Sequence, residues 1–509
     1  MSVVCLSAER SKPFPSSGIG VDHREAPLLA ALREYREREI VPFSTPGHKQ
    51  GAAVDDEAMA VLGASTFAAD VWLNAGDFDR CLRAAESLAA DAWGAERGFF
   101  LSNGSSAGNH AALLATVNPG DVVIVNRDLH TSLLAGLILS GARPVYVMPR
   151  LHPELDASLG LEAAEVAAAL RRHPEAKLIA LVSPTYWGVA SDVAAIAAVA
   201  HEHGVPLYVD EAWGPHFAFH PALPRPALAS GADLAVTSVH KLLSGLGQGA
   251  LLLARGSRVD PGRLAASVRM TRSTSPSVRI YASLDACRRQ MALAGEALLE
   301  RTLALATEAR RRLGRIRGLT VLDADRLGVA ATRCDPTRLA IDVHGLGLTG
   351  IEVERELWRR FGIAPEMSDL RGIVCLLTIG DTAASVDRLV RALATIGAEA
   401  CVDVSNGSDR LPRSGGALLA PGAQVLTPRE AFGAPTRAVP LGAAVGEIAA
   451  ELIVPYPPGI PVLAPGEAIG AEKVAYLAEC AARGLHVCGA ADAGLETVRV
   501  VGWASGVRR

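Results

Sequence analysis

The chain has 509 residues, of which 50% are hydrophobic and 20% are charged, and its formal net charge is −4. This balance is typical of a globular protein and excludes a disordered chain. Because acidic and basic residues nearly cancel, no basic surface favours nucleic acid or an anionic membrane as a partner. The length predicts roughly two to four structural units.

The cysteines and the first twenty residues indicate a reducing compartment. The eight cysteines are scattered and form no C-x-x-C pair, so we expect neither a metal site nor a disulfide framework. Residues 1–20 contain Pro13 and Pro15 and lack the continuous apolar core of a signal peptide. Other apolar stretches, such as 251–253, are far too short to span a bilayer. We therefore expect a cytoplasmic protein without a membrane partner.

Short apolar runs alternate with helical, Ala-rich stretches from about residue 80 onward. Before them, residues 27–39 predict an amphipathic helix that Pro42 ends. The runs are Val122–Val125, Pro144–Val147, Leu178–Val182, Pro206–Val209 and Leu234–Val236. Runs of this kind, separated by stretches long enough for a helix, predict buried parallel strands in βαβ units. Polar residues follow directly after several of them, at the sheet edge where ligands bind in such folds.

The second half of the chain predicts smaller units. A long helix, about 280–313, leads to strand-like runs at 339–343 and 372–377 with a helix at 349–361 between them. A polar stretch with Gly and Pro, 405–421, is interpreted as a linker. The expected units are an N-terminal arm (1–70), a large domain (71–320), a small domain (321–405) and a C-terminal domain (421–509).

Lys241 is the first candidate for chemistry. It follows the run ending at Val236, and His240 and Ser238 precede it. A lysine at a strand end can form a Schiff base with pyridoxal 5′-phosphate (PLP) if its amine is accessible and partly neutral. Hydroxyl and imidazole groups just before it can hold the phosphate. Taken alone, the motif favours a plain surface lysine.

Three further motifs supply the other parts of a PLP site. Asp210 ends a strand, where it can keep the pyridine nitrogen protonated or simply cap a helix. Ser105 and Ser106 precede an apolar helix and can bind a phosphate or form an ordinary capping turn. His130 can lie over the cofactor ring, although a lone histidine is more often structural. Glu211 is interpreted as a solvated or structural neighbour. Chance occurrence of all four motifs in this order is improbable, so together they predict a PLP enzyme.

The motifs resemble those of the Orn/Lys/Arg decarboxylase family, in its short form, among fold type I PLP enzymes. The resemblance covers about residues 25–500. Its motifs are Ser44–Gly51, Ser183–Gly188, Asp210–Gly214, Ser238–Lys241, Ser273–Ser277, Thr378–Thr382 and Val454–Glu467. It implies an α/β large domain with a mostly parallel seven-stranded sheet, followed by smaller α+β C-terminal domains.

The resemblance also implies roles for individual residues. Lys241 would be the Schiff-base lysine, Asp210 the pyridinium partner, and Trp213 a neighbour of the cofactor. His130 would stack on the ring. The residues implied to hold the phosphate are Ser105, Ser106, Ser238 and His240. Ser275, in the segment 273–277, would reach the phosphate of a neighbouring subunit, which implies a homodimer. Thr131 and Trp213 depart from the residues usual in many relatives.

The activity implied is decarboxylation of a basic L-amino acid to an amine, a polyamine precursor, with arginine slightly favoured over lysine and ornithine. Either Lys241 or His240 would return a proton to Cα. A carboxylate must bind the cationic end of the substrate; Glu467 is one candidate, and other acidic residues compete with it. The alternatives are an aminotransferase, an oxidase that uses O₂, and a non-catalytic PLP-binding relative.

Overall fold

The centre of the molecule is a seven-stranded sheet with the strand order β1-β7-β6-β5-β4-β2-β3. The computed structural model describes residues 21–73, 75–153, 155, 157–400, 420–456, 461–482 and 485–502. The strands are β1 (Arg97–Leu101), β2 (Val122–Asn126), β3 (Arg143–Val147), β4 (Leu178–Val182), β5 (Leu207–Asp210), β6 (Leu234–Thr237) and β7 (Ala250–Ala254). β7 pairs antiparallel with both of its neighbours, and the other neighbouring pairs are parallel. The mostly parallel seven-stranded sheet is thus confirmed.

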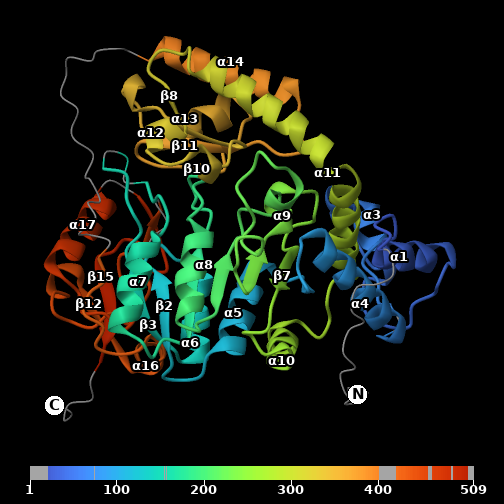
Figure 1. Cartoon of the computed structure of the whole chain (residues 1–509). Coiled ribbons are helices and arrows are strands. Elements are labelled where there is room, and N and C mark those ends of the chain that lie inside the picture. The colour runs from blue at the N-terminus through green and yellow to red at the C-terminus, as the bar shows by residue number, and fades with distance from the viewer. Residues whose placement is uncertain are drawn as a thin grey trace.

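Helices cover both faces of this sheet, which explains why its strands are continuous apolar runs. All five residues of β2 are buried: Val123 and Val125 face one apolar cluster, and Val122 and Ile124 face the other. The helices of the first face are α5 (Gly104–Thr116), α6 (Thr131–Ser140) and α10 (Pro261–Thr271). Those of the second are α4 (Ala75–Ala92), α7 (Ala163–Arg172), α8 (Val193–Glu202) and α11 (Val278–Leu313). Figure 1 shows α7 and α8 covering the near side of the sheet.

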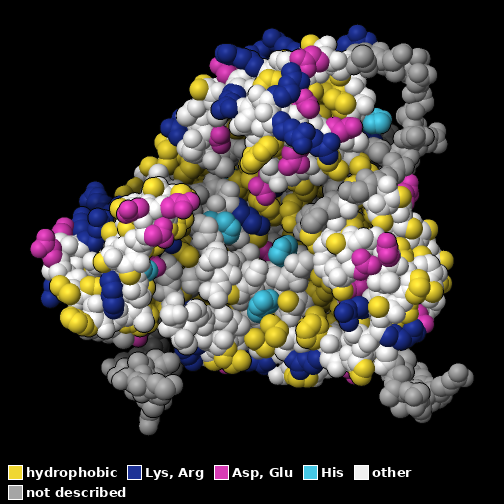
Figure 2. Space-filling view, turned by 180° about the vertical axis from the view of Figure 1, so that it is seen from behind, with side chains coloured by type: hydrophobic (Ala, Val, Ile, Leu, Met, Phe, Trp, Pro, Cys, Tyr) yellow, Lys and Arg dark blue, Asp and Glu magenta, His cyan; other side chains and the backbone are white. Residues whose placement is uncertain are grey.

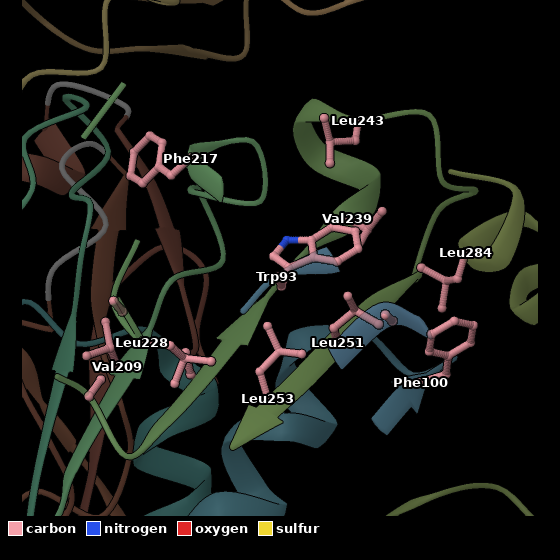
Figure 3. Packing of buried hydrophobic residues seen from close by; sticks show 14 of the residues in the cluster. Trp93, Phe100, Val209, Phe217, Leu228, Val239, Leu243, Leu251, Leu253 and Leu284 are labelled. Carbon is pink, nitrogen blue, oxygen red and sulfur yellow. The ribbon is translucent and has the colours of Figure 1, made fainter. Parts of the chain in front are cut away.

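The apolar cluster of the second face joins strands to loops and helices that are far apart in the chain (Figure 3). Trp93 and Phe100 pack there with Leu251 and Leu253 of β7 and with Leu284 of α11. The indole N–H of Trp93 has a hydrogen-bond partner in these apolar surroundings, because it donates to the carbonyl of Pro215 at 3.1 Å. The five strands predicted from apolar runs are all present, whereas β1 and β7 were not among those runs.

A smaller unit follows α11 and lies above the large sheet in Figure 1. Its antiparallel sheet has the order β10-β11-β9-β8. The strands are β8 (Thr320–Leu322), β9 (Arg338–Asp342), β10 (Met367–Ser368) and β11 (Gly372–Leu376); the main helices are α13 (Gly350–Glu356) and α14 (Ala383–Glu399). Residues of α11, the sheet and both helices share one apolar cluster. The domain boundary predicted at residue 320 stays a prediction.

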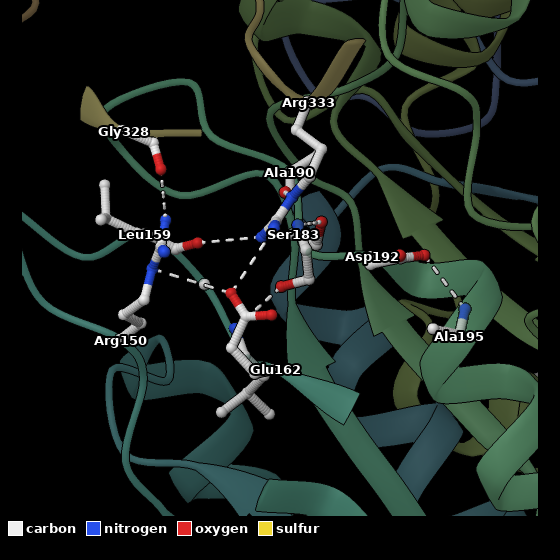
Figure 4. Close-up of polar contacts among 12 residues, drawn as sticks. Arg150, Leu159, Glu162, Ser183, Ala190, Asp192, Ala195, Gly328 and Arg333 are labelled. Atoms are coloured by element: carbon white, nitrogen blue, oxygen red, sulfur yellow. Dashed lines mark hydrogen bonds and ion pairs between the residues drawn. The ribbon is translucent and has the colours of Figure 1, made fainter. Parts of the chain in front are cut away.

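Polar contacts tie this smaller unit to loops of the large one (Figure 4). Arg333 donates to the carbonyls of Ala190 at 2.7 Å and Leu159 at 3.2 Å. In the opposite direction, Arg150 of the large unit donates to the carbonyl of Gly328 at 2.9 Å. Each arginine satisfies backbone carbonyls that lie outside regular secondary structure. These bonds hold the smaller unit over the carboxyl ends of the parallel strands.

The last unit lies beside β3 and α7 in Figure 1. Its elements are α16 (Pro428–Gly433), β12 (Thr436–Pro440), β13 (Val454–Tyr456), α17 (Ala471–Ala482), β14 (His486–Cys488) and β15 (Thr497–Val501). β12 pairs with β15 and β13 with β14, both antiparallel. At the other end of the chain, α1 (Pro27–Glu37) fits the predicted amphipathic helix. Within the described part of the chain, no helix combines the length and hydrophobicity that a membrane crossing needs.

Candidate active site

The carboxyl ends of β2, β5 and β6 bring the predicted site residues to one edge of the sheet. His130 follows β2, Asp210 ends β5, and Lys241 lies in a short helix, α9 (Val239–Leu242), directly after β6. This edge faces the smaller unit. Figure 2 shows a hollow below that unit, where histidine and Lys or Arg side chains gather.

Lys241 lies against the indole of Trp213. Its Nζ is 3.7 Å from the centroid of that ring, a cation–π distance when the amine is charged. Burial lowers the pKa of Lys241 to about 8; Asp210 and Glu366 oppose the shift, and the positive Arg338 adds to it. A much larger fraction of this amine is therefore neutral near pH 7 than in an exposed lysine. The structure thus gives Lys241 the partly neutral amine that Schiff-base formation requires.

Asp210 is held by Asn109, a buried residue of α5. The Nδ2 of Asn109 donates to Oδ2 of Asp210 at 2.8 Å and to the hydroxyl of Ser132 at 2.7 Å. Its Oδ1 accepts a hydrogen bond from the hydroxyl of Tyr208. The other carboxylate oxygen of Asp210 accepts from the backbone N–H of Ala212 at 3.1 Å. Sequence reasoning assigned no role to Asn109; the available signal was its position four residues after Ser105, on the same face of the helix.

His130 has the structural role considered for it, and its contact with the cofactor ring stays a prediction. Its Nδ1 accepts from the backbone N–H of Ser132 at 3.2 Å and lies 2.7 Å from the Ser132 hydroxyl, so the ring caps α6. Burial lowers the pKa of His130, Lys241 lowers it further, and Asp210 opposes both. These electrostatic interactions place the imidazole near Asp210 and Lys241, and its lowered pKa favours the neutral ring.

Three groups around the start of α5 and α9 are suited to an anion. No side chain caps the N-terminus of α5, and Ser105 and Ser106 lie in its first turn. The hydroxyl of Ser238 is fully buried and has no hydrogen-bond partner in the protein. His240 uses Nδ1 to contact the carbonyl of Gly249 at 3.0 Å, and that contact makes Nδ1 the donor. An orphaned buried hydroxyl beside a free helix N-terminus fits a phosphate.

The smaller unit adds two charged residues that sequence reasoning missed. Arg338 begins β9, is fully buried, and has its guanidinium carbon 4.5 Å from the centroid of the Trp213 ring. One of its N–H groups donates to the carbonyl of Tyr186 at 3.1 Å. Glu366 is more exposed and interacts electrostatically with both Lys241 and Arg338. Desolvation raises the pKa of Glu366, and the two cations oppose that shift.

Ser275 lies apart from these residues, in an exposed turn between α10 and α11. Its backbone N–H bonds to the hydroxyl of Ser273 at 3.1 Å. A single chain does not test the contact expected with a neighbouring subunit, which stays a prediction. Among the described residues, no cluster of three or more His, Cys, Asp or Glu residues is suited to a metal ion.

The structure decides between the alternatives left open for two acidic residues, Glu467 and Glu211. Glu467 is fully buried, and its two oxygens pair with Arg127 at 2.5 and 2.9 Å and with Lys473 at 3.2 Å, so it is not a carboxylate of an open substrate pocket. Glu211 is not solvated: it is buried and accepts the backbone N–H of Ala227 at 2.8 Å. Burial raises the pKa of Glu211 to about 8. Both carboxyl groups are therefore engaged by partners within the protein.

Comparison with known proteins identifies the family. The Orn/Lys/Arg decarboxylase major domain matches residues 26–385, and the C-terminal domain of the same family matches residues 416–490. An arginine decarboxylase of Bacillus subtilis (strain 168) is 39% identical, over 94% of this chain and 99% of that relative. An arginine decarboxylase of Halalkalibacterium halodurans is 37% identical, over 94% and 98%.

Solved structures support the same fold. Lysine decarboxylase A from Pseudomonas aeruginosa superposes with a TM-score of 0.80 at 24% sequence identity, over 94% of this chain and 81% of that one. L-threonine transaldolase from Pseudomonas fluorescens superposes with a TM-score of 0.53 over 64% of this chain. The expected fold class, that of type I PLP enzymes, is confirmed. On the sequence matches, this chain belongs to the Orn/Lys/Arg decarboxylase family.

Proposed function

We propose that this chain decarboxylates a basic L-amino acid, with arginine as its main substrate, and that it uses PLP. The observation that carries the proposal is the placement of a partly neutral Lys241 close to a buried Asp210 that Asn109 holds in position. Family membership supports the reaction class, and the curated relatives that are 39% and 37% identical bear the name arginine decarboxylase.

The residues present fit the cofactor. The phosphate would be held by Ser105 and Ser106 at the start of α5 and by Ser238, whose buried hydroxyl otherwise has no partner. His240 has Nε2 available for the same group, since Nδ1 contacts Gly249. When bound, PLP supplies an aldehyde that condenses with amines and a ring that stabilises negative charge at Cα.

Each remaining residue then has a defined task. Asp210, held by two donors and buried, keeps a proton on the ring nitrogen. His130 would contact the ring as a neutral imidazole, since its pKa is lowered. The amine of Lys241 would hold the cofactor when neutral and, when protonated, would supply the proton for Cα. We prefer Lys241 to His240 for that last step because both nitrogens of His240 are then engaged.

Glu366 is the carboxylate we propose for the cationic end of the substrate. It comes from the smaller unit and interacts electrostatically with Lys241 and Arg338, so it lies near the amine that would hold the cofactor. Glu467 is unsuited, because its oxygens are already paired with buried cations. A guanidinium recognised by a carboxylate forms two parallel charge-assisted hydrogen bonds, which favours arginine over the shorter ammonium side chains.

The decisive experiment offers L-arginine, L-lysine and L-ornithine to the purified protein with PLP and measures CO₂ and amine by mass spectrometry. We expect equal amounts of CO₂ and amine, fastest from arginine, and neither product from Lys241→Ala. Formation of a keto acid or hydrogen peroxide would instead identify an aminotransferase or an oxidase. Retention of a PLP absorbance band near the aldimine wavelength in Lys241→Ala would contradict the assignment of this lysine.

We further infer that the active form is a homodimer that works in the cytoplasm and feeds polyamine synthesis. Two features support the dimer: the exposed turn with Ser275, and apolar side chains such as Phe43, which is 98% exposed. Light scattering measures the mass. Mixing Ser275→Ala with Lys241→Ala protomers tests whether sites are shared, because one site of each mixed dimer then has all its residues and activity above either variant is expected. Cell fractionation tests the location.

A further inference from the structure

The segment from Arg127 to Gly141 carries His130 and α6, and its first residue is bound to the C-terminal unit. Arg127 forms a bidentate ion pair with Glu467, with N–O distances of 2.5 and 2.9 Å. Both side chains are at most 1% exposed, and Lys473 of α17 completes the cluster at 3.2 Å from Glu467. Paired guanidinium and carboxylate groups in this geometry resist rotation as well as separation.

The C-terminal unit also holds the other end of α6. Arg429 of α16 donates from Nε to the carbonyl of Ile138 at 2.7 Å and donates a second hydrogen bond to the carbonyl of Leu139. Those carbonyls belong to the last turn of α6, where a cation is electrostatically favoured. The guanidinium sits directly over Gly141, where a Cβ atom would lie 2.6 Å from it. Two separate contacts from one unit therefore hold both ends of the segment.

The chain between Arg127 and His130 is held by hydrogen bonds, so it has little freedom to move. The backbone N–H of Arg127 bonds to the carbonyl of Val147 at 2.9 Å, and the next residue, Asp128, accepts from the hydroxyl of Ser158 at 2.5 Å. His130 follows two residues later and already caps α6. A shift of Arg127 or of the far end of the helix would therefore move the imidazole.

We propose that Glu467 and Arg429 are positioning residues that hold His130 in place for the cofactor ring. This inference rests on the proposed function, because it needs His130 to lie against PLP. It gives the C-terminal unit a task in cofactor binding, although Glu467 and Arg429 are not among the residues proposed to contact the cofactor. It also gives Glu467 a role other than the substrate-binding one suggested by its sequence motif, because its carboxylate acts through Arg127 and not on the substrate.

The test compares Arg429→Met, Arg127→Lys and Glu467→Gln with Arg437→Met. The control removes an exposed ion pair of the same unit, Arg437 with Glu447 at 2.6 Å, that is not part of these contacts with α6. PLP affinity is measured by titrating the apoprotein, together with circular dichroism of the bound cofactor and amide hydrogen exchange of residues 130–140. We expect roughly fivefold weaker PLP binding for Arg429→Met, because only part of the stabilisation from its two hydrogen bonds is transmitted to His130, and a larger loss for Glu467→Gln. Faster exchange in α6 of the apoprotein should accompany it, whereas Arg437→Met should match the wild type.

Arg127→Met removes the charge and should weaken PLP binding most. Arg127→Lys keeps the charge and should have a PLP affinity between those of Arg127→Met and the wild type. If Glu467→Gln does not fold, Arg429→Met decides the question, because that side chain is exposed. Cofactor affinity, dichroism and α6 exchange that equal those of Arg437→Met would overturn the proposal. His130→Ala distinguishes a failure of the positioning inference from a failure of the role proposed for His130. If it weakens PLP binding while the positioning variants do not, only this inference fails. If His130→Ala itself has no effect, the proposed role of His130 fails as well.

Discussion

Asn109 donates a hydrogen bond of 2.8 Å to Asp210, which is 101 positions away in the chain. The same amide group donates to Ser132, whose hydroxyl lies 2.7 Å from Nδ1 of His130. One buried side chain thus connects the residue assigned to the ring nitrogen with the residue assigned to the ring face. Because the members of such a network orient one another, a change in Asn109 should affect both.

Replacing Asn109 with Leu should weaken cofactor binding without unfolding the protein. The variant loses a hydrogen bond to a charged carboxylate, worth about 1.5–3 kcal/mol, so we expect PLP to bind at least about tenfold more weakly. Absorbance titration of the apoprotein measures this. Thr116→Val, which removes a hydroxyl bonded to the Ala112 carbonyl at the far end of the same helix, is the control. Equal PLP affinity in the two variants would show that Asn109 does not support Asp210.

Much of the fold and of the candidate site could be predicted because the patterns that indicate them lie within short stretches of sequence. Strands buried on both faces must be apolar throughout, and β2 and β4 to β6 were predicted from that pattern. The polar residues that end such strands are brought to one edge by the topology alone. Lys241, Asp210 and His130 were identified in this way, each within five residues of the end of a predicted strand.

The remaining features depend on pairings between distant segments. Glu467 was one candidate for the carboxylate of the substrate pocket, because its sequence motif does not reveal that Arg127, 340 positions away, neutralises it. Arg338 begins β9 and Glu366 directly precedes β10, and only the placement of the smaller unit brings them to Lys241. Asn109 lacked a visible partner for the same reason. Helix and strand periodicity carries no information about such contacts.

The lowered pKa of Lys241 predicts how the apoprotein captures PLP at different pH values. Only the neutral amine reacts, so the capture rate should rise with pH, with a midpoint near the pKa of about 8, and level off above it. Stopped-flow absorbance measures the rate. Linkage adds a second consequence: because the folded pKa lies below the ordinary value of 10.5, the stability of the apoprotein gains from this group as pH rises from about 8 to 10.5. A capture midpoint near 10.5 would contradict the burial of this amine.

Glu366→Gln should shift that midpoint downward and weaken substrate binding. The carboxylate raises the pKa of Lys241, so its removal lowers that pKa and makes the amine neutral at lower pH. The variant also loses the group proposed to bind the cationic end of the substrate, so KM for arginine should rise about tenfold or more, with a smaller change in kcat. Glu354→Gln, on neighbouring helix α13, is the control. An unchanged KM would show that another residue binds the cationic end of the substrate.

Glu211→Gln should make stability less sensitive to pH. Burial raises the pKa of Glu211 to about 8 from an ordinary value of 4.5, so the folded state holds a proton that the unfolded state has lost between these values. Stability therefore falls as pH rises from 4.5 to 8, by up to about 1.4 kcal/mol per unit. Glutamine keeps the acceptor for Ala227 and never ionises. The variant's advantage in thermal unfolding midpoint should grow from pH 5 to pH 8, and a constant difference would show that Glu211 is ionised in the fold.

Gly108→Ala should loosen α5 and weaken cofactor binding together. A Cβ at this position would collide with the Val236 side chain of β6 and lie 2.9 Å from Cδ1 of Leu101 in β1, so the helix must move away from the sheet. Such overpacking costs about 1–3 kcal/mol. The displaced helix carries Ser105 at its first turn and Asn109 next to the substitution, so PLP affinity should fall along with the unfolding midpoint. Gly433→Ala, where a Cβ meets no atom within 4 Å, is the matched control and should change neither. A loss of stability with unchanged PLP affinity would show that α5 does not position the phosphate and ring-nitrogen partners as proposed.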